Sequence, residues 1–247
     1  MKITIVGCGD AFGSGGRSNT CFRVDAAGRT VLADFGASAL VAWSGLRFDT
    51  NDIDGIALSH LHGDHFGGLP FLILQAEFEA HRTKPLDIAG PPGLRARLDA
   101  LCEAMFPGMM RHTWSFPLNI KEVTPGQSAQ VGGLLLNTIE VIHPSGAPAT
   151  GLRLSDGEKL FAYSGDTAWT DAVFRVAEGA DLMMMECYAA QPGVPHHIDW
   201  PTLRQKLPLF SAKRTILTHL GEAALAMFAA DAPAGVEVAQ DGAVYDV

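Results

Sequence analysis

Several short apolar segments of this chain end on a single residue that can bind a metal ion or move a proton. The segments are 56–59, 139–142, 161–165, 181–185 and 215–218, and the residues that follow them are His60, His143, Asp166, Glu186 and His219. Apolar runs of this length predict buried β-strands. One such residue alone is typical of an ordinary turn. Together they predict a shared cleft, because strand ends that meet along one edge of a sheet hold their side chains rigidly.

The remaining pattern predicts an α/β chain in which both halves contain strands followed by helices. In the first half we expect strands at 2–6, 21–24, 30–33, 55–58 and 86–89, and helices at 37–43, at 67–79 and after Gly93. In the second half we expect strands at 134–142, 151–154, 159–163, 181–185 and 215–217, and helices at 171–177, 201–207 and 222–229. No linker rich in serine or glycine divides the sequence. We therefore expect one domain over residues 1–247, an αββα four-layer sandwich with two sheets back to back.

Composition limits the partners and the compartment. A hydrophobic content of 47% supports a large core, and a net charge of −9 argues against a broad nucleic-acid surface. The N-terminal segment lacks the pattern of a secretory signal, and the apolar runs are too short to span a membrane. The four cysteines form no Cys-x-x-Cys pair, which is typical of reduced thiols. We expect a cytoplasmic protein with no membrane partner; the oligomeric state stays open, with a homodimer as one alternative.

A dense histidine cluster gives the strongest chemical signal. The run His60-Leu61-His62-Gly63-Asp64-His65 supplies four metal-binding side chains in six residues. Imidazole and carboxylate together suit zinc best, and manganese and iron are compatible. His60 and His62 can point to the same side of an extended segment, whereas Asp64 and His65 lie further along the turn. One ion cannot easily take all four ligands, so the cluster predicts two divalent metal ions.

This run resembles the His-x-His-x-Asp-His motif of the metallo-β-lactamase superfamily, and the resemblance extends over nearly the whole chain. It implies that one metal ion is held by His60, His62 and His143, and the other by Asp64, His65 and His219. It also implies that Asp166 bridges the two ions.

A closer resemblance is to the branch that contains ribonuclease Z and cyclic phosphodiesterases. It rests on the segments 7–13, 59–70, 90–93 and 164–167. In that branch a glutamate after a late strand and a downstream histidine form a catalytic pair, which implies Glu186 and His197 here. The sequence His197-Ile198-Asp199 differs from the usual His-x-Thr or His-x-Ser, so His196 stays open as the alternative catalytic histidine.

The resemblance implies hydrolysis by a hydroxide held between the two ions, with Asp64 orienting the nucleophile. Glu186 would then align His197 to protonate the leaving group, although a structural ion pair at a helix start is the alternative. The segment 144–165 is too short for the RNA-docking arm of ribonuclease Z. We therefore expect a phosphodiesterase for small cyclic or nucleotide-like phosphodiesters, with no stable nucleic-acid partner. The alternatives are a ribonuclease Z-like endonuclease, a lactonase or thioesterase at the same site, and a non-catalytic metal-binding protein.

Other features of the sequence are weaker indications of function. The Gly7-x-Gly9 run imitates a dinucleotide-binding fingerprint, but 13–19 is a poor helix start and 21–24 is expected to be the next strand. The run 183–185 of methionines is expected to fill the core. His81 and His112 lie outside the strand-end pattern. Hydroxyls at Ser59 and Thr218 either support the neighbouring histidines or satisfy backbone groups. Whether Trp43, Met109, Met110 and Trp114 are core or line a pocket stays open.

Overall fold

Two seven-stranded sheets form the centre of the molecule. The computed structural model describes residues 1–247. In the first sheet the strand order is β14-β1-β2-β3-β4-β5-β6. Its strands are β1 (Lys2–Gly7), β2 (Cys21–Ala26), β3 (Arg29–Ala33), β4 (Gly55–Ala57), β5 (Leu86–Gly90), β6 (Leu118–Glu122) and β14 (Val244–Asp246). Strands β14 to β3 pair antiparallel, and β3 to β6 pair parallel.

The second sheet repeats this plan with the order β13-β12-β11-β10-β9-β8-β7. Its strands are β7 (Ser128–Val131), β8 (Leu134–Val141), β9 (Ala149–Ser155), β10 (Leu160–Tyr163), β11 (Leu182–Glu186), β12 (Thr215–Thr218) and β13 (Glu237–Val238). Strands β7 to β10 pair antiparallel, and β10 to β13 pair parallel. Because the parallel strands of each sheet all run the same way, their carboxyl ends lie along one edge.

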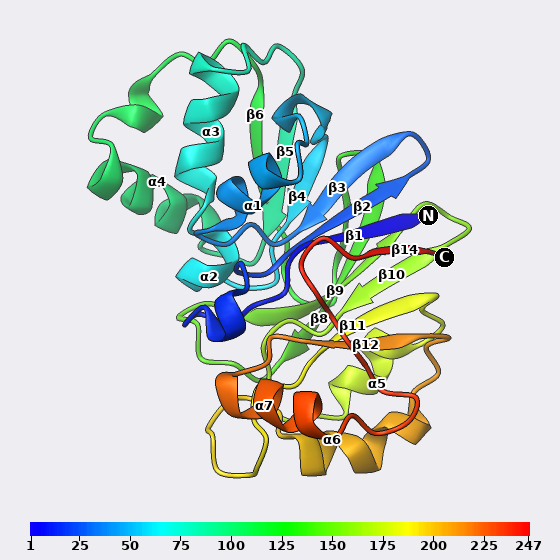
Figure 1. Cartoon of the computed structure of the whole chain (residues 1–247). Coiled ribbons are helices and arrows are strands. Elements are labelled where there is room, and N and C mark those ends of the chain that lie inside the picture. Colours follow the sequence, from blue (N-terminus) through cyan, green and yellow to red (C-terminus); the bar gives the residue numbers. More distant parts are fainter.

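Helices cover the outer face of each sheet (Figure 1). On the first sheet these are α1 (Ala39–Gly45), α3 (Leu69–Phe78) and α4 (Leu94–Met105), and a short α2 (Gly63–Phe66) lies in the loop after β4. On the second sheet they are α5 (Ala172–Ala177), α6 (Trp200–Lys206) and α7 (Glu222–Ala230). None of these helices is long and apolar enough to cross a membrane.

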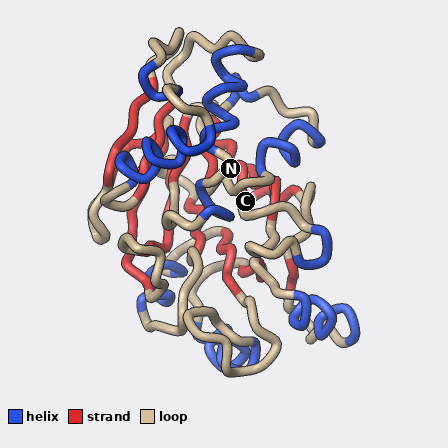
Figure 2. The backbone as a smooth tube through the Cα atoms, turned by 90° about the vertical axis from the view of Figure 1, so that its left-hand side faces the viewer, coloured by secondary structure: helices blue, strands red, loops and turns tan.

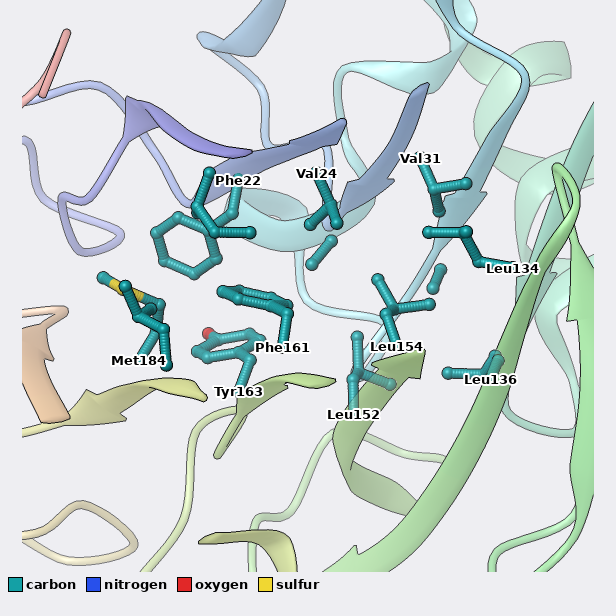
Figure 3. Packing of buried hydrophobic residues seen from close by; sticks show 14 of the residues in the cluster. Phe22, Val24, Val31, Leu134, Leu136, Leu152, Leu154, Phe161, Tyr163 and Met184 are labelled. Atoms are coloured by element: carbon teal, nitrogen blue, oxygen red, sulfur yellow. The ribbon is translucent and has the colours of Figure 1, made fainter. Parts of the chain in front are cut away.

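Three buried clusters correspond to the three interfaces between four layers. The largest lies between the sheets, where Phe22, Val24 and Val31 of the first sheet face Leu154 and Phe161 of the second (Figure 3). A second cluster joins the first sheet to α1, α3 and α4, and a third joins the second sheet to α5, α6 and α7. The predicted αββα sandwich is therefore confirmed.

The two ends of the chain meet at the edge of the first sheet. Strand β14 pairs with β1, and the amino group of Met1 donates to the carbonyl oxygen of Val247 at 3.1 Å. The termini accordingly lie close together in the perpendicular view of Figure 2. Every strand expected from the sequence is present, with ends that differ by up to two residues. Strands β6, β7, β13 and β14 were not predicted.

The missed strands are short, and β6, β13 and β14 contain no buried residue. In β6 only Leu118 and Ile120 are half-buried, and β13 and β14 have two and three residues. An edge strand buries only part of one face, so it leaves a short, weak alternation in the sequence.

Candidate metal centre

The predicted ligands lie together at the carboxyl ends of the parallel strands. One group of side chains that could hold a metal ion contains His60, His62 and His143, and a second contains Asp64, His65, Asp166 and His219. Within each group the candidate ligand atoms lie within 4.8 Å of one another. The first sheet supplies the residues after β4, and the second sheet supplies those after β8, β10 and β12. The centre therefore spans both sheets.

In the loop after β4, successive side chains point in opposite directions until helix α2 begins. Leu61 is fully buried, so its extended neighbours His60 and His62 turn toward the centre. Helix α2 begins after His62 and carries Asp64 and His65 to the other ligand group. The backbone N–H of Phe35 donates to the carbonyl oxygen of His65 at 2.7 Å and fixes this turn against the end of β3.

Asp166 lies in the middle of the cluster. Its Oδ2 atom is 3.2 Å from Nε2 of both His65 and His219, 3.8 Å from Nε2 of His60 and 3.9 Å from Nε2 of His143. On one side, Nε2 of His143 lies 3.1 Å from Nδ1 of His62. One carboxylate thus faces imidazoles of both groups.

Orphaned polar atoms test whether a metal fits this cluster. Nε2 of His60, Nε2 of His65 and Oδ1 of Asp166 are buried without a hydrogen-bond partner. Leaving such atoms unpaired in the interior is costly. Imidazole nitrogens and carboxylate oxygens that converge on a common point are a donor set that divalent zinc accepts. The residues present therefore fit a bound divalent ion.

In three of these rings the opposite nitrogen is held by a neighbour. Nδ1 of His65 lies 2.7 Å from Oδ2 of Asp34, and Nδ1 of His60 lies 3.0 Å from the Ser59 hydroxyl. Such partners fix the tautomer and the ring orientation of a metal ligand. Nδ1 of His143 lies 3.0 Å from the carbonyl oxygen of His196, and this hydrogen bond leaves Nε2 of His143 directed at the cluster.

Asp34 is a functional residue that the sequence analysis missed. It is fully buried, and besides His65 it accepts hydrogen bonds from the backbone N–H and the hydroxyl of Ser59, both at 2.7 Å. The signal was present, because Asp34 directly follows the strand 30–33. The sequence analysis did not include it among the strand-end residues.

Strained backbone is also present at this edge. Asp34 and His219 adopt left-handed φ angles of 60° and 58°, and Gly165, just before Asp166, has φ of 63°. Non-glycine residues rarely take this conformation, and it costs free energy that the surrounding structure must supply. The backbone N–H of His219 donates to the carbonyl oxygen of Cys8 at 3.0 Å, which helps to hold the strained residue.

The electrostatics of the cluster are those of a cation site. Burial lowers the pKa of His60 well below its usual range, so its imidazole is neutral, the form that binds a metal. Burial also lowers the pKa of His65, but the charges of Asp166, Asp64 and Asp34 outweigh it and raise that pKa well above the usual range. The three carboxylates around His65 carry negative charge into a buried site, and a bound divalent ion would neutralise part of it.

Glu186 and His197 form a pair beside the metal ligands. Nδ1 of His197 lies 2.5 Å from Oε1 of the fully buried Glu186, and the backbone N–H of Ile198 donates to Oε2 at 2.7 Å. Burial raises the pKa of Glu186 to about 7. Burial lowers the pKa of His197, but the hydrogen bond to Glu186 and its charge outweigh this effect and raise it. The ring of His197 lies 5.0 Å from that of His143, between centroids.

The structure separates the two neighbouring histidines. His196 is exposed, has φ of 65° and contributes its backbone carbonyl to His143, whereas the side chain of His197 faces Glu186. Asp199, which departs from the usual Thr or Ser, caps α6: its carboxylate accepts from the backbone N–H of Thr202 at 2.8 Å. It has the capping role that a hydroxyl residue could also fill.

The other side chains singled out in the sequence lie outside the ligand cluster or in the core. The Thr218 hydroxyl donates to the carbonyl oxygen of Cys8, so of the two hydroxyls only that of Ser59 contacts a ligand histidine. Residues 14–16 form a 3₁₀ turn and not a dinucleotide-binding helix. The methionines at 183–185 are buried in the core as expected. Trp43 and Met109 are also core, and Met110 and Trp114 pack against it. His81 and His112 do not belong to either ligand group.

Comparison with known proteins agrees with the fold. The chain is 25% identical over 226 residues to the probable metallo-hydrolase YhfI of Bacillus subtilis, covering 89% of this chain and 87% of YhfI. Ribonuclease Z of Methanothermobacter thermautotrophicus is 25% identical over 275 aligned positions, which cover 89% of this chain and 86% of that protein. The crystal structure of human tRNase Z, short form, superposes with a TM-score of 0.80 at 22% identity, over 100% of this chain and 99% of that one. A diphosphatase from the PhnP family gives a TM-score of 0.79 at 18% identity, over 100% of this chain and 97% of that one.

The fold, the ligand cluster and these relatives define a hydrolase of the metallo-β-lactamase superfamily, in the branch of ribonuclease Z and related phosphodiesterases. Within this class, the sequence profile described as anti-Pycsar protein Apyc1 matches residues 1–245, and the chain belongs to that family.

Proposed function

We propose that this hydrolase is a dinuclear phosphodiesterase for small cyclic or nucleotide-like phosphodiesters. The observation that carries the proposal is the pairing of His197 with buried Glu186 directly beside the two ligand groups. Expulsion of an alkoxide from a phosphodiester gains from a proton donor at the leaving oxygen, and His197 is placed to be that donor.

In this proposal one ion would be held by His60, His62 and His143 and the other by Asp64, His65 and His219, with the Asp166 carboxylate available to both. Zinc fits these ligands best. Two such ions supply an activated water at neutral pH and stabilise charge on the phosphoryl oxygens.

The chain's own residues then position the reactants and move the protons. The Asp64 carboxylate lies 3.1 Å from Nε2 of His65, and it is placed to accept a hydrogen bond from the attacking water and to orient it. His197 donates a proton from Nε2 to the leaving oxygen, because Nδ1 is held by Glu186. Glu186 is a positioning residue that keeps the ring in this orientation and favours its protonated form.

Two observations support a small substrate. The segment 144–165 is taken up by a short loop, β9, a turn and β10, so its residues build the second sheet. The net charge of −9 also disfavours a long polyanion. The matched family is described as anti-Pycsar, and we propose that hydrolysis at this centre serves such an action.

The test is a substrate panel with metal-replete protein. Bis(p-nitrophenyl) phosphate, a nucleoside 3′,5′-cyclic phosphate, a tRNA precursor and an acyl-homoserine lactone are compared by kcat/KM. We expect cleavage of the two diesters and little turnover of the lactone. Turnover of the lactone without diester cleavage would contradict the proposal.

A ribonuclease Z-like endonuclease is the second candidate, because several curated relatives carry that name at 24–25% identity. The same panel decides between the two. Cleavage of the tRNA precursor with a higher kcat/KM than the cyclic phosphate would favour the endonuclease.

A further inference from the structure

A third group of side chains at the metal centre has the composition of a metal site. It contains His143, Asp166 and His197, whose candidate ligand atoms lie within 4.8 Å of one another. His143 is shared with the first ligand group, which is His60, His62 and His143, and Asp166 is shared with the second. His197 is therefore the only new member. We call these three residues the His197 group.

The donors of the His197 group suit zinc. Two imidazoles and one carboxylate with an open fourth position are the ligand set of several zinc hydrolases. Imidazole nitrogen suits zinc better than it suits magnesium or manganese, which prefer oxygen ligands. The group thus fits a zinc ion by the chemistry of its side chains.

His197 is held from behind in the way that the metal ligand His65 is held. Nδ1 of His197 lies 2.5 Å from Oε1 of Glu186, and Nδ1 of His65 lies 2.7 Å from Oδ2 of Asp34. Both carboxylates are fully buried. A carboxylate in this position orients an imidazole and strengthens it as a metal ligand. Nε2 of His197 can therefore accept a metal ion in place of a proton.

His143 can serve only one ion at a time. Its Nδ1 atom lies 3.0 Å from a backbone carbonyl oxygen, so only Nε2 is available to a metal ion. Its ring lies 5.0 Å, between centroids, from the ring of His60 and also from the ring of His197. Asp166 differs, because it has two oxygens and its Oδ1 atom is buried without a hydrogen-bond partner. An ion bound to His143 is thus held either by the first ligand group or by the His197 group.

We propose that the His197 group is an alternative position for the first metal ion, and that the ion it takes is zinc. An ion in this position would occupy Nε2 of His197, the atom that protonates the leaving oxygen in the proposed reaction. The centre would then lack its proton donor, so this position defines a resting form that does not turn over. The inference goes beyond the proposed function, because it concerns where the metal binds and holds for any substrate.

The first experiment counts zinc ions in a variant that lacks the first position. His60→Ala/His62→Ala removes two ligands of the first ligand group and leaves the His197 group complete. After dialysis against buffered zinc we expect about two zinc ions per chain, because three protein ligands suffice for a zinc site. Adding His197→Ala to this variant should reduce the content to about one zinc ion per chain.

The matched control changes the neighbouring histidine. His60→Ala/His62→Ala/His196→Asn alters a side chain outside the His197 group, and asparagine tolerates the left-handed φ of 65° at that position. It should retain about two zinc ions per chain. About one zinc ion per chain in His60→Ala/His62→Ala would overturn the inference. Equal zinc content with and without His197 would also overturn it, because other residues would then hold the ion.

A second pair of variants covers the loss of stability. His60 is fully buried, so its replacement by alanine leaves a cavity. His60→Gln/His62→Gln fills this space with a polar side chain and allows the same comparison with and without His197. Circular dichroism and the melting temperature show which pair is folded, and zinc is counted in that pair.

NMR identifies the ligand atom in the folded variant. Cadmium-113 replaces zinc, and the histidines are labelled with nitrogen-15. We expect a coupling between cadmium and Nε2 of His197. Absence of this coupling while about two cadmium ions are bound per chain would overturn the inference.

The substrate panel separates this inference from the proposed function. If the zinc counts are as expected and the wild type cleaves only the lactone, the alternative position stands and the phosphodiesterase falls. If the wild type cleaves the diesters and the zinc content does not depend on His197, the phosphodiesterase stands and the alternative position falls. A wild-type chain that binds no zinc would contradict both.

Discussion

His197 and its neighbour His196 show how position in the fold separates residues of the same type. Both are histidines in one loop, yet only the His197 side chain contacts Glu186, while His196 offers a backbone carbonyl to His143. The chemistry available to each therefore follows from its contacts. A proton donor is most useful when the leaving group is a poor one.

Replacement of His197 should expose this dependence on the leaving group. We expect His197→Ala to lower kcat by about a hundredfold or more on a diester with an alkoxide leaving group. The loss on bis(p-nitrophenyl) phosphate should be much smaller, because p-nitrophenolate leaves without protonation. Steady-state rates on both substrates check this.

His196→Asn is the control, because asparagine tolerates the left-handed φ of 65°. It should retain wild-type rates on both substrates. Equal losses in the His196 and His197 variants would assign the effect to the loop and not to proton transfer.

Asp181 illustrates a charge that acts on stability and lies outside the metal centre. Its Oδ1 accepts from Nζ of Lys213 at 2.7 Å, and its Oδ2 accepts from the backbone N–H of Leu160 at 2.9 Å. The hydrogen bond from Lys213 is the main reason that the pKa of Asp181 falls from 3.8 to about 2. A lowered pKa means that the carboxylate stabilises the folded state above pH 3.8, and that this contribution is lost as the pH falls toward about 2.

Asp181→Asn should therefore destabilise the protein in a pH-dependent way. At neutral pH we expect a loss of about 1 kcal/mol in the free energy of unfolding, because Lys213 is largely exposed and its charge is screened. The difference from wild type should shrink as the pH falls below 3.8. Urea unfolding at a series of pH values measures it, and a difference that is constant with pH would show that the charge is not involved.

At the scale of the elements, the turn after β3 packs in close contact with helix α2. A Cβ at Gly36 would lie 2.1 Å from the carbonyl oxygen of Asp64. The ligand loop after β4 thus depends on a glycine from a different loop, and its position cannot be read from its own sequence. Phe35 and His65 join the same two elements by a backbone hydrogen bond.

Gly36→Ala should displace α2 and weaken metal binding. We expect a stability loss of about 1–3 kcal/mol from the overpacked contact and a lower metal content after dialysis. Gly63→Ala is the matched control, because a Cβ at Gly63 meets no atom within 4 Å. Metal analysis of both variants tests this, and equal metal content in the two would contradict the steric argument.

At the scale of the whole molecule, the metal centre joins the two sheets. His60 and His65 follow strand β4 of the first sheet, and His143, Asp166 and His219 follow strands of the second. A ligand that binds only the folded state stabilises it in proportion to its occupancy. Metal ions at this position would therefore hold the two halves of the sandwich together.

Metal removal should lower the melting temperature. With free metal at about a hundred times Kd, binding contributes about 2.7 kcal/mol. For a chain of this length the loss corresponds to a shift of about 5–10 °C, measured by calorimetry with and without chelator. Asp166→Ala should show a smaller response to the chelator, and a wild-type melting temperature that the chelator does not change would rule out a structural role.

Much of the fold could be predicted because the sandwich repeats one pattern twice. Strand β1 is buried and apolar over most of its length, and β8 buries every second residue over much of its length, so the sequence pattern locates both. The edge strands β6 and β7 give a weaker signal, since they are short and about half of their residues are exposed. The order of strands in each sheet was not predicted, because it depends on pairings between segments far apart in the chain.

The sequence alone determined which side chains could meet at the centre. The motif from His60 to His65 and the polar residues at strand ends are local features, and strands of one direction bring their ends to one edge. Tertiary structure decided what holds those side chains in place and what lies beside them. Asp34 against His65, His197 against Glu186 and the approach of His197 to His143 arise between distant segments. Contacts of that kind form only when the two sheets pack together.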